Sequence, residues 1–260
     1  MRNVNILTNN GVDVKKSLEL FGEMVMYDAT MNDFLEEVNV LVDRMNRYKN
    51  IGDMANYAIE VHALKSDAKY LGFTKLAELA YDHELKSKAN DRLYINNNYT
   101  ELINETNKMI ELSKKYLNSN DKTELNNINS NVTDINQKTI LIVDDSNIIQ
   151  NFIERILHND YKILVASNGE EAIDIIKKDY NHNIACMLLD LNMPKMDGFA
   201  VLDYLKETDL FKVIPVSIIT GNDYKEQIER AFTYPIVDMI VKPFNESNIR
   251  NVIEKTLSIK

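Results

Sequence analysis

Charged residues follow three short apolar runs in the second half of the sequence. In chain order they are Asp144 and Asp145 after residues 140–143, Asp190 after 187–189, and Lys242 after 240–241. Short apolar runs are typical of buried strands, and parallel sheets place their chemistry at the carboxyl ends of their strands. If these runs are parallel strands of one sheet, we expect the three carboxylates and the ammonium group to meet in a single cleft.

Such a cleft would suit phosphoryl transfer. Carboxylates held together repel one another, and burial raises their pKa values unless a cation joins them; Mg²⁺ is a cation that carboxylates, carbonyls and waters hold. A magnesium ion with open positions can bind a phosphoryl group, whose other oxygens would contact Lys242 and the hydroxyl of Thr220, at the end of residues 215–220. The residues therefore predict phosphorylation of Asp190 through positioning and charge neutralisation.

A second candidate for phosphoryl chemistry is His62. Apolar residues recur at spacings of three and four along residues 53–71, which leaves His62, Lys65, Ser66 and Lys69 on the opposite helix face. An exposed imidazole is largely neutral near pH 7 and can attack a phosphoryl donor. The two lysines would offset the charge of a phosphohistidine, and the small Ser66 would let another protein approach.

The elements that must position these residues differ between the two halves. Residues 1–118 show helical periodicity without strand alternation, and short connections between amphipathic helices predict an antiparallel four-helix bundle. We expect a first helix that starts with a capping-box pattern at Thr30 and Asp33, a second over 53–71, a third through 76–85, and a fourth from a polar break at 96–98 to Leu117.

From residue 138 to 260 the pattern alternates between strands and helices. Strands are predicted at 139–143, 162–166, 184–189, 213–219 and 237–241, and helices at 147–158, 169–179, 198–207, 223–232 and 246–258. Five strand–helix units imply an α/β doubly wound parallel sheet covered on both faces. Residues 119–137 are rich in Asn, Ser, Asp and Thr, which predicts a flexible polar linker or a partly helical connector between two domains.

The second half resembles the receiver domain of two-component response regulators. The motifs occur in that family's order: Asp144-Asp145, then Asp190-x-x-Met193-Pro194-x-Met196-Asp197-Gly198, Thr220-Gly221 and Lys242-Pro243-Phe244. The resemblance implies a flavodoxin-like fold with Asp190 as the phosphoacceptor. It also implies Mg²⁺ held by Asp144, Asp145, Asp190 and the backbone carbonyl of Asn192, with Thr220 and Lys242 in contact with the phosphoryl group.

Two further positions bear on this resemblance. The family suggests a cis peptide bond between Lys242 and Pro243. Three residues before Lys242, receivers usually carry a Tyr or Phe whose ring reports phosphorylation, and Met239 stands there instead. The usual aromatic switch is therefore in doubt.

The segment that begins at His62 resembles the signature of histidine phosphotransfer (HPt) domains. His62, Leu64 and Lys65 match its His-x-Leu-Lys pattern, and Leu71-Gly72 follows as usual, whereas the family commonly has Gly where Ser66 stands. The resemblance implies that His62 carries a phosphoryl group. His83 falls near the apolar stripe of the third helix, so packing is expected there.

The two resemblances together indicate a phosphorelay protein that passes phosphate between His62, Asp190 and partner proteins. The expected partners are a sensor histidine kinase or its receiver and HPt domains, and a downstream receiver or HPt protein. Such a receiver would catalyse its own phosphorylation and slow dephosphorylation. Two alternatives stay open: a single-step response regulator whose bundle binds a partner or dimerises while His62 is inert, and a phosphate-sink adaptor that drains a kinase.

Composition narrows the remaining possibilities. A net charge of -10 argues against binding of nucleic acid, and the single cysteine, Cys186, lies in an apolar run that favours burial. The sequence shows neither a long apolar span nor a signal peptide, so we expect no direct membrane insertion and a cytoplasmic location. With 7 Gly and no glycine-rich ATP lid, an ATP-dependent kinase is not expected, and neither is a DNA-binding regulator.

Overall fold

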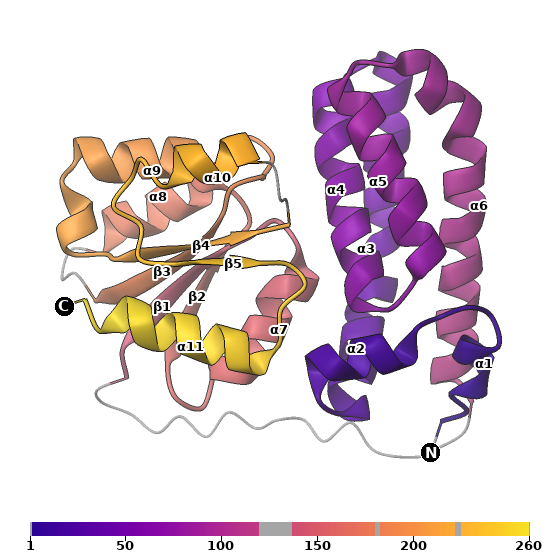
Figure 1. The fold of residues 1–260 in the computed structure, drawn as a ribbon, viewed down its shortest axis with the longest axis horizontal. Helices are drawn as coiled ribbons and strands as arrows, with labels where there is room; N and C mark the ends of the chain where they lie inside the picture. Colours follow the sequence, from indigo (N-terminus) through magenta and orange to yellow (C-terminus); the bar gives the residue numbers. More distant parts are fainter. Residues whose placement is uncertain (1, 120–136, 180–182, 222–224, 260) are drawn as a thin grey trace.

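The structure is a computed structural model that describes residues 2–119, 137–179, 183–221 and 225–259. A helical domain and an α/β domain lie side by side (Figure 1). The predicted linker falls almost entirely on residues 120–136, outside the described part of the chain.

The helical domain is built on four long helices. Its elements are α1 (Asn5–Thr8), α2 (Val14–Phe21), α3 (Met24–Ile51), α4 (Met54–Tyr70), α5 (Thr74–Lys88) and α6 (Arg92–Leu117). The long helices run beside one another, and the short α1 and α2 pack at one end of them (Figure 1). Asp53 and Asp91 cap α4 and α6 by accepting hydrogen bonds from backbone N–H groups of the first turn.

Two of the predicted helix starts are wrong. Helix α3 begins at Met24, and Thr30 lies inside it as a buried residue whose hydroxyl donates to the carbonyl of Met26 at 2.9 Å. Helix α6 begins at Arg92 and continues through residues 96–98, where the Asn98 amide donates to the carbonyl of Tyr94 at 2.8 Å. Polar side chains that bond back to the preceding turn are compatible with a helix that packing holds on its other face.

The α/β domain has the predicted alternation. It contains β1 (Thr139–Val143), α7 (Asn147–Leu157), β2 (Lys162–Ala166), α8 (Gly169–Lys178), β3 (Ile184–Asp190), α9 (Gly198–Glu207), the 3-10 helix η1 (Leu210–Lys212), β4 (Val216–Thr220), α10 (Lys225–Ala231), β5 (Met239–Val241) and α11 (Glu246–Leu257). All pairings are parallel, in the order β2-β1-β3-β4-β5. This is the flavodoxin-like order of a doubly wound sheet.

The burial of each strand agrees with its place in the sheet. Every residue of β1, β3 and β4 is buried, as expected for apolar strands in the middle of a sheet covered on both faces, whereas β2 and β5 are partly exposed at the edges. Helices α7 and α11 cover one face, and α8 and α9 the other, with α10 beside α9 (Figure 1). Strand β4 begins later than predicted because the chain first forms η1.

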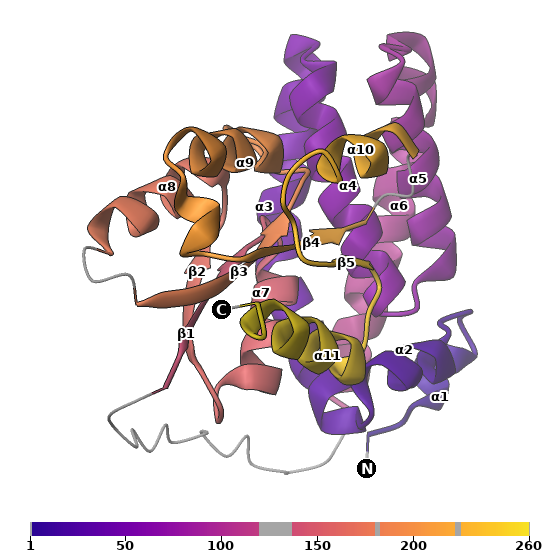
Figure 2. The ribbon, with the colours of Figure 1, turned by 60° about the vertical axis from the view of Figure 1, so that its left-hand side comes forward.

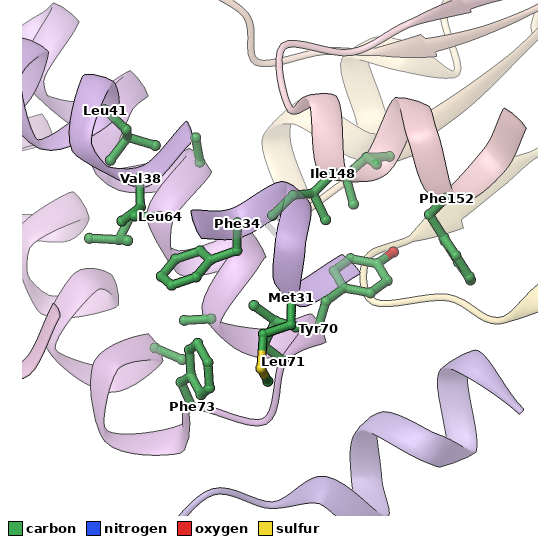
Figure 3. Close-up of a cluster of buried hydrophobic side chains, with 14 of the residues drawn as sticks. Met31, Phe34, Val38, Leu41, Leu64, Tyr70, Leu71, Phe73, Ile148 and Phe152 are labelled. Atoms are coloured by element: carbon green, nitrogen blue, oxygen red, sulfur yellow. The ribbon is translucent and has the colours of Figure 1, made fainter. Parts of the chain in front are cut away.

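The apolar core continues from one domain into the other. Phe152 of α7 packs against the rings of Phe21 and Tyr70 from the helical domain, with ring centroids 5.1 Å and 5.9 Å away. Figure 3 shows Ile148 and Phe152 on the α/β side of the cluster, next to Tyr70. These contacts fix the helical domain against α7, and the strands end on the side that faces α3 and α4 (Figures 1 and 2).

Candidate functional site: an acidic cleft beneath a buried histidine

Three carboxylates meet at the carboxyl edge of the sheet. Val143 pairs with Leu189, so Asp144, the next residue after β1, lies beside Asp190 at the end of β3. One oxygen from each of Asp144, Asp145 and Asp190 lies within 4.8 Å of the others. Carboxylate oxygens at this spacing form a donor set that suits a hard divalent cation. The three carboxylates therefore converge at one edge of the sheet, as predicted.

Lys242 completes this cluster from the far side of β4. Its backbone N–H donates to the carbonyl of Thr220 at 2.7 Å, and its side chain reaches back so that Nζ lies 2.6 Å from Asp144 Oδ2 and 2.5 Å from Asp190 Oδ2. The Lys242–Pro243 peptide bond is cis, as the resemblance suggested. Thr220 is buried at the end of β4, one strand away from Asp190.

Burial and crowding shift the ionisation of this site. Desolvation raises the pKa of Asp144 to about 6, against the opposing effect of Lys242, and raises that of Asp145 as well, with Asp144 and Asp190 adding to the rise. Burial alone would lower the pKa of Lys242, but the charges of Asp144 and Asp190 hold it above its usual range. One ammonium group therefore does not neutralise the cluster, which leaves room for a further cation.

The loops that carry these aspartates are held by local hydrogen bonds. Asp144 Oδ1 accepts from the Ser146 N–H and Asp190 Oδ1 accepts from the Asn192 N–H, both at 3.0 Å. A Cβ at Gly198 would lie 2.2 Å from the carbonyl oxygen of Asp190, so the Asp-Gly turn requires glycine here. Gln150, which sequence reasoning missed, donates to the carbonyl of Asp144 at 2.5 Å.

His62 is buried, contrary to the expected exposure. Only 3% of its surface is accessible, because Gly221 of the α/β domain lies against His62 and Ser66 on this face of α4. Within the described residues, His62 Nε2 has no hydrogen-bond partner. A Cβ at Gly221, directly after Thr220, would lie 3.0 Å from this nitrogen. The imidazole therefore lies over the end of β4, next to the strand that carries Asp190.

The other ring nitrogen of His62 contacts a carboxylate from the neighbouring helix. Glu84 Oε1 of α5 lies 2.8 Å from His62 Nδ1 and 2.6 Å from Lys88 Nζ, and Glu84 Oε2 lies 2.5 Å from Lys65 Nζ. Burial would raise the pKa of Glu84, but His62, Lys65 and Lys88 hold it well below its usual range. Because an ionised carboxylate only accepts, the Nδ1 atom of His62 carries the proton and Nε2 presents a lone pair.

Burial also lowers the pKa of His62, although Glu84 opposes that change and the charge of Asp190 raises the pKa slightly. The imidazole is therefore neutral near pH 7. The Nε2 atom of this ring faces Gly221 at the end of β4, the strand that pairs with β3 next to Asp190.

A second helical-domain carboxylate reaches the edge of the acidic cleft. Asp67 of α4 is 5% exposed, and its Oδ1 accepts a hydrogen bond from the Ser146 hydroxyl at 3.1 Å. Burial, with help from the charge of Glu37, raises the pKa of Asp67 to about 8. The sequence analysis did not single out this residue.

Two other histidines and the cysteine fit structural roles. His83 is buried and pairs with the Tyr57 hydroxyl at 2.7 Å, and His158 Nδ1 lies 3.0 Å from the carbonyl of Arg155. Cys186 is buried in β3, as predicted. No helix among the described residues is long and apolar enough to cross a membrane.

Comparisons with known proteins match the α/β domain. A family model described as "Response regulator receiver domain" matches residues 140–254. A chemotaxis protein CheY homolog from Campylobacter jejuni is 30% identical over 122 residues, which cover 45% of this chain and 91% of that protein. A probable cyclic di-GMP phosphodiesterase from Vibrio cholerae is 32% identical over 127 residues, but these cover only 28% of that protein and 49% of this chain.

Among solved structures, the receiver domain of the Francisella response regulator 1452 matches at 27% identity with a TM-score of 0.42, covering 48% of this chain and all of that one. The family match and the CheY homolog agree on the same half of the chain. Receiver domains act in two-component signalling, where they interact with histidine kinases or phosphotransfer proteins and generally bind Mg²⁺ through acidic residues. The chain therefore belongs to the response regulator receiver family through its α/β domain.

Proposed function

We propose that this protein is a phosphorelay component in which the helical domain is HPt-like and His62 exchanges phosphoryl groups with receiver aspartates. Asp190 is the phosphoacceptor of its own receiver. One observation carries the proposal: His62 presents Nε2, free of hydrogen bonds within the described residues, at the same strand ends that carry the acidic cleft. A buried imidazole with a lone pair at this position is chemically suited to carry a phosphoryl group.

The receiver half of the proposal assigns a role to each residue of the cleft. Asp144, Asp145 and Asp190, with the backbone carbonyl of Asn192, would hold Mg²⁺, which when bound neutralises charge on the phosphoryl oxygens. The carboxylate of Asp190 attacks phosphorus. Lys242 and Thr220 bind phosphoryl oxygens, and Lys242 is already placed within 2.6 Å of two of the carboxylates.

The helical half is supported by the surroundings of His62. Glu84 holds the imidazole in the tautomer that leaves Nε2 unprotonated, and it stabilises the positive ring that forms when Nε2 is phosphorylated. Lys65 and Lys88 pair with Glu84 and supply positive charge next to the ring. The geometry parallels a nucleophile oriented by a hydrogen-bonded partner.

The partners proposed from this chemistry are a sensor histidine kinase or its receiver and HPt domains on one side and a downstream receiver or HPt protein on the other. The receiver would also catalyse its own slow dephosphorylation. The protein would not use ATP itself.

Labelling with acetyl [³²P]phosphate and Mg²⁺ tests the assignment. We expect base-labile acyl phosphate in the wild type and its loss in Asp190→Asn. We also expect acid-labile phosphohistidine that is lost in His62→Gln and kept in His158→Gln, a control at a histidine outside the cleft. Absence of base-stable, acid-labile label from the wild type would contradict the role of His62.

One alternative has an observation in its favour. Because docking buries His62 to 3% exposure, the helical domain would also serve as a cover that a single-step regulator releases, with His62 inert. That alternative predicts normal acyl phosphate on Asp190 and no phosphohistidine in any variant, so the same experiment separates the two.

A further inference from the structure

The contacts between the domains follow one face of α4. From its middle to its end, His62 lies against Gly221, Asp67 accepts from Ser146, and the Tyr70 hydroxyl accepts from the Phe244 N–H at 3.1 Å. The three receiver segments contacted are the loops after β4, β1 and β5. One helix therefore covers the carboxyl edge of the sheet across the acidic cleft (Figures 1 and 2).

An ion pair between α3 and α7 also fixes the orientation of the helical domain against the α/β domain. Asp33 of α3 receives both terminal nitrogens of Arg155 from α7, at 2.8 Å and 3.0 Å. Both side chains are partly buried, with 12% and 24% exposure. A two-point contact of this kind adds geometric specificity to the apolar packing around Phe152.

Docking also hides both phosphorylatable residues. Asp190 is completely buried and His62 nearly so, which means that another protein cannot contact either side chain in this arrangement. Small molecules can still reach the residues around His62 and the acidic cleft through two crevices. A crevice of about 580 Å³ reaches His62 and Asn192 beside Lys88 and Arg92, and another of about 710 Å³ reaches Asp145 and Asp67.

We infer that the docked form is an intramolecular phosphotransfer complex, in which His62 and Asp190 of one chain are each other's partners, and that exchange with any other protein requires the domains to separate. The inference rests on the proposed function, since it needs His62 to be phosphorylatable. It adds the identity of the transfer partner and the order of events: loading and unloading by proteins occur in the open form, and transfer within the chain occurs in the closed form.

The transfer step balances without an additional reactant. In the forward direction the Nε2–P bond of phosphohistidine breaks, its electron pair returns to Nε2, and an oxygen of Asp190 forms the new O–P bond. The ring keeps its Nδ1 proton, hydrogen-bonded to Glu84, and becomes neutral. The reverse step phosphorylates His62 from the acyl phosphate, so the direction depends on which residue is loaded first.

Dilution and mixing test whether transfer occurs within one chain. Full-length wild type is labelled with acetyl [³²P]phosphate and Mg²⁺ over a range of protein concentrations, beside an equimolar mixture of His62→Gln and Asp190→Asn chains. Asp190→Asn alone measures direct labelling of His62. Domains tethered in one chain meet at an effective concentration in the millimolar range, so at about 1 µM protein the wild type should form phosphohistidine roughly 1,000-fold faster than the mixture.

The Arg155 contact provides a matched pair of variants. We expect Arg155→Glu, which places two carboxylates opposite each other, to slow phosphohistidine formation at least 10-fold in the same assay. The exchange Asp33→Arg with Arg155→Glu restores opposite charges and should recover the rate. The acyl phosphate on Asp190, measured in the same samples, normalises each variant for the amount of loaded receiver.

The outcomes separate this inference from the proposed function. Phosphohistidine that forms at a first-order rate independent of protein concentration supports transfer within the chain. A rate that rises with concentration in the wild type as it does in the mixture would overturn transfer within the chain while His62 keeps its proposed role. Absence of phosphohistidine from every sample would overturn both the inference and the proposed function. If the exchange of charges at residues 33 and 155 does not recover the rate, transfer does not occur in the docked arrangement of the structure.

Discussion

The carboxylate of Glu84 lies 2.8 Å from His62 Nδ1, and it also binds the buried ammonium group of Lys65. One residue of α5 therefore sets the tautomer of the histidine and neutralises a lysine on the same face of α4. The side chain of Glu84 is 1% exposed, so removing its carboxylate would leave the buried ammonium group of Lys65 without its counter-charge.

Glu84→Ala should therefore destabilise the helical domain. Removal of one partner of a buried ion pair leaves the other uncompensated, and we expect the free energy of unfolding in urea to fall by about 3 kcal/mol. Lys88→Ala is the matched control, because the Lys88 side chain is 37% exposed and its loss should cost about 1 kcal/mol or less. Equal losses in the two variants would contradict the role assigned to Glu84.

Lys242→Ala should slow phosphorylation of Asp190. The ammonium group of Lys242 lies between two carboxylates, where it can offset negative charge on the phosphoryl oxygens during transfer. Without it we expect the rate of acyl phosphate formation from acetyl phosphate to fall about 100-fold. Lys195→Ala removes an exposed lysine from the loop after β3 and should leave that rate within a factor of about two.

Acidification should separate the domains through His62. Docking lowers the pKa of the imidazole below its ordinary 6.5, mainly by burial, so the open form binds the proton more readily. The contribution of His62 to docking is then fully present above pH 6.5 and is lost as the pH falls below it. Distance measurements between spin labels on the two domains, without Mg²⁺, should show this opening in Asp67→Asn and not in the double variant with His62→Gln.

A rise in pH should weaken docking through Asp67, whereas His62 weakens docking when the pH falls. Docking raises the pKa of this carboxyl from 3.8 to about 8, so the docked form holds a proton that the open form releases, and docking weakens as the pH rises through this window. The groups around it are Glu37 and Asp144, which oppose ionisation, and Lys242 and the Ser146 hydroxyl, which favour it. His62→Gln chains should show this loss between about pH 3.8 and about 8, and Asp67→Asn should abolish it.

Much of the α/β domain could be predicted because its signals are local. Apolar runs bounded by charged or turn-forming residues placed all five strands, and the order of the motifs placed Asp144, Asp145, Asp190 and Lys242 at one edge. The carboxyl ends of parallel strands lie at the same edge of the sheet, so a residue that follows a predicted strand can be placed at that edge from the sequence.

The surroundings of His62 could not be predicted in the same way. The periodicity of α4 identifies its polar face but not what covers that face. His62 and Lys65 were expected in solvent, but His62 is buried against Gly221 of the second domain and Lys65 against Glu84 of α5. Glu84 did leave a signal: it stands four residues after Ala80 and eight after Leu76, where the apolar stripe of α5 would place an apolar side chain. Asp67 left none, because its partner is 79 residues away.

The rings of Phe21, Tyr70, Phe152 and Phe244 belong to a single hydrophobic cluster drawn from both domains. The covalent connection between the domains is therefore not what keeps them together. If residues 2–119 and 137–259 were made as two separate polypeptides, the same rings would still be available to pair, and the complex would reassemble as a heterodimer. Joining the two domains in one chain would then supply stoichiometry and speed of encounter to an association that ring packing and the Asp33–Arg155 ion pair specify.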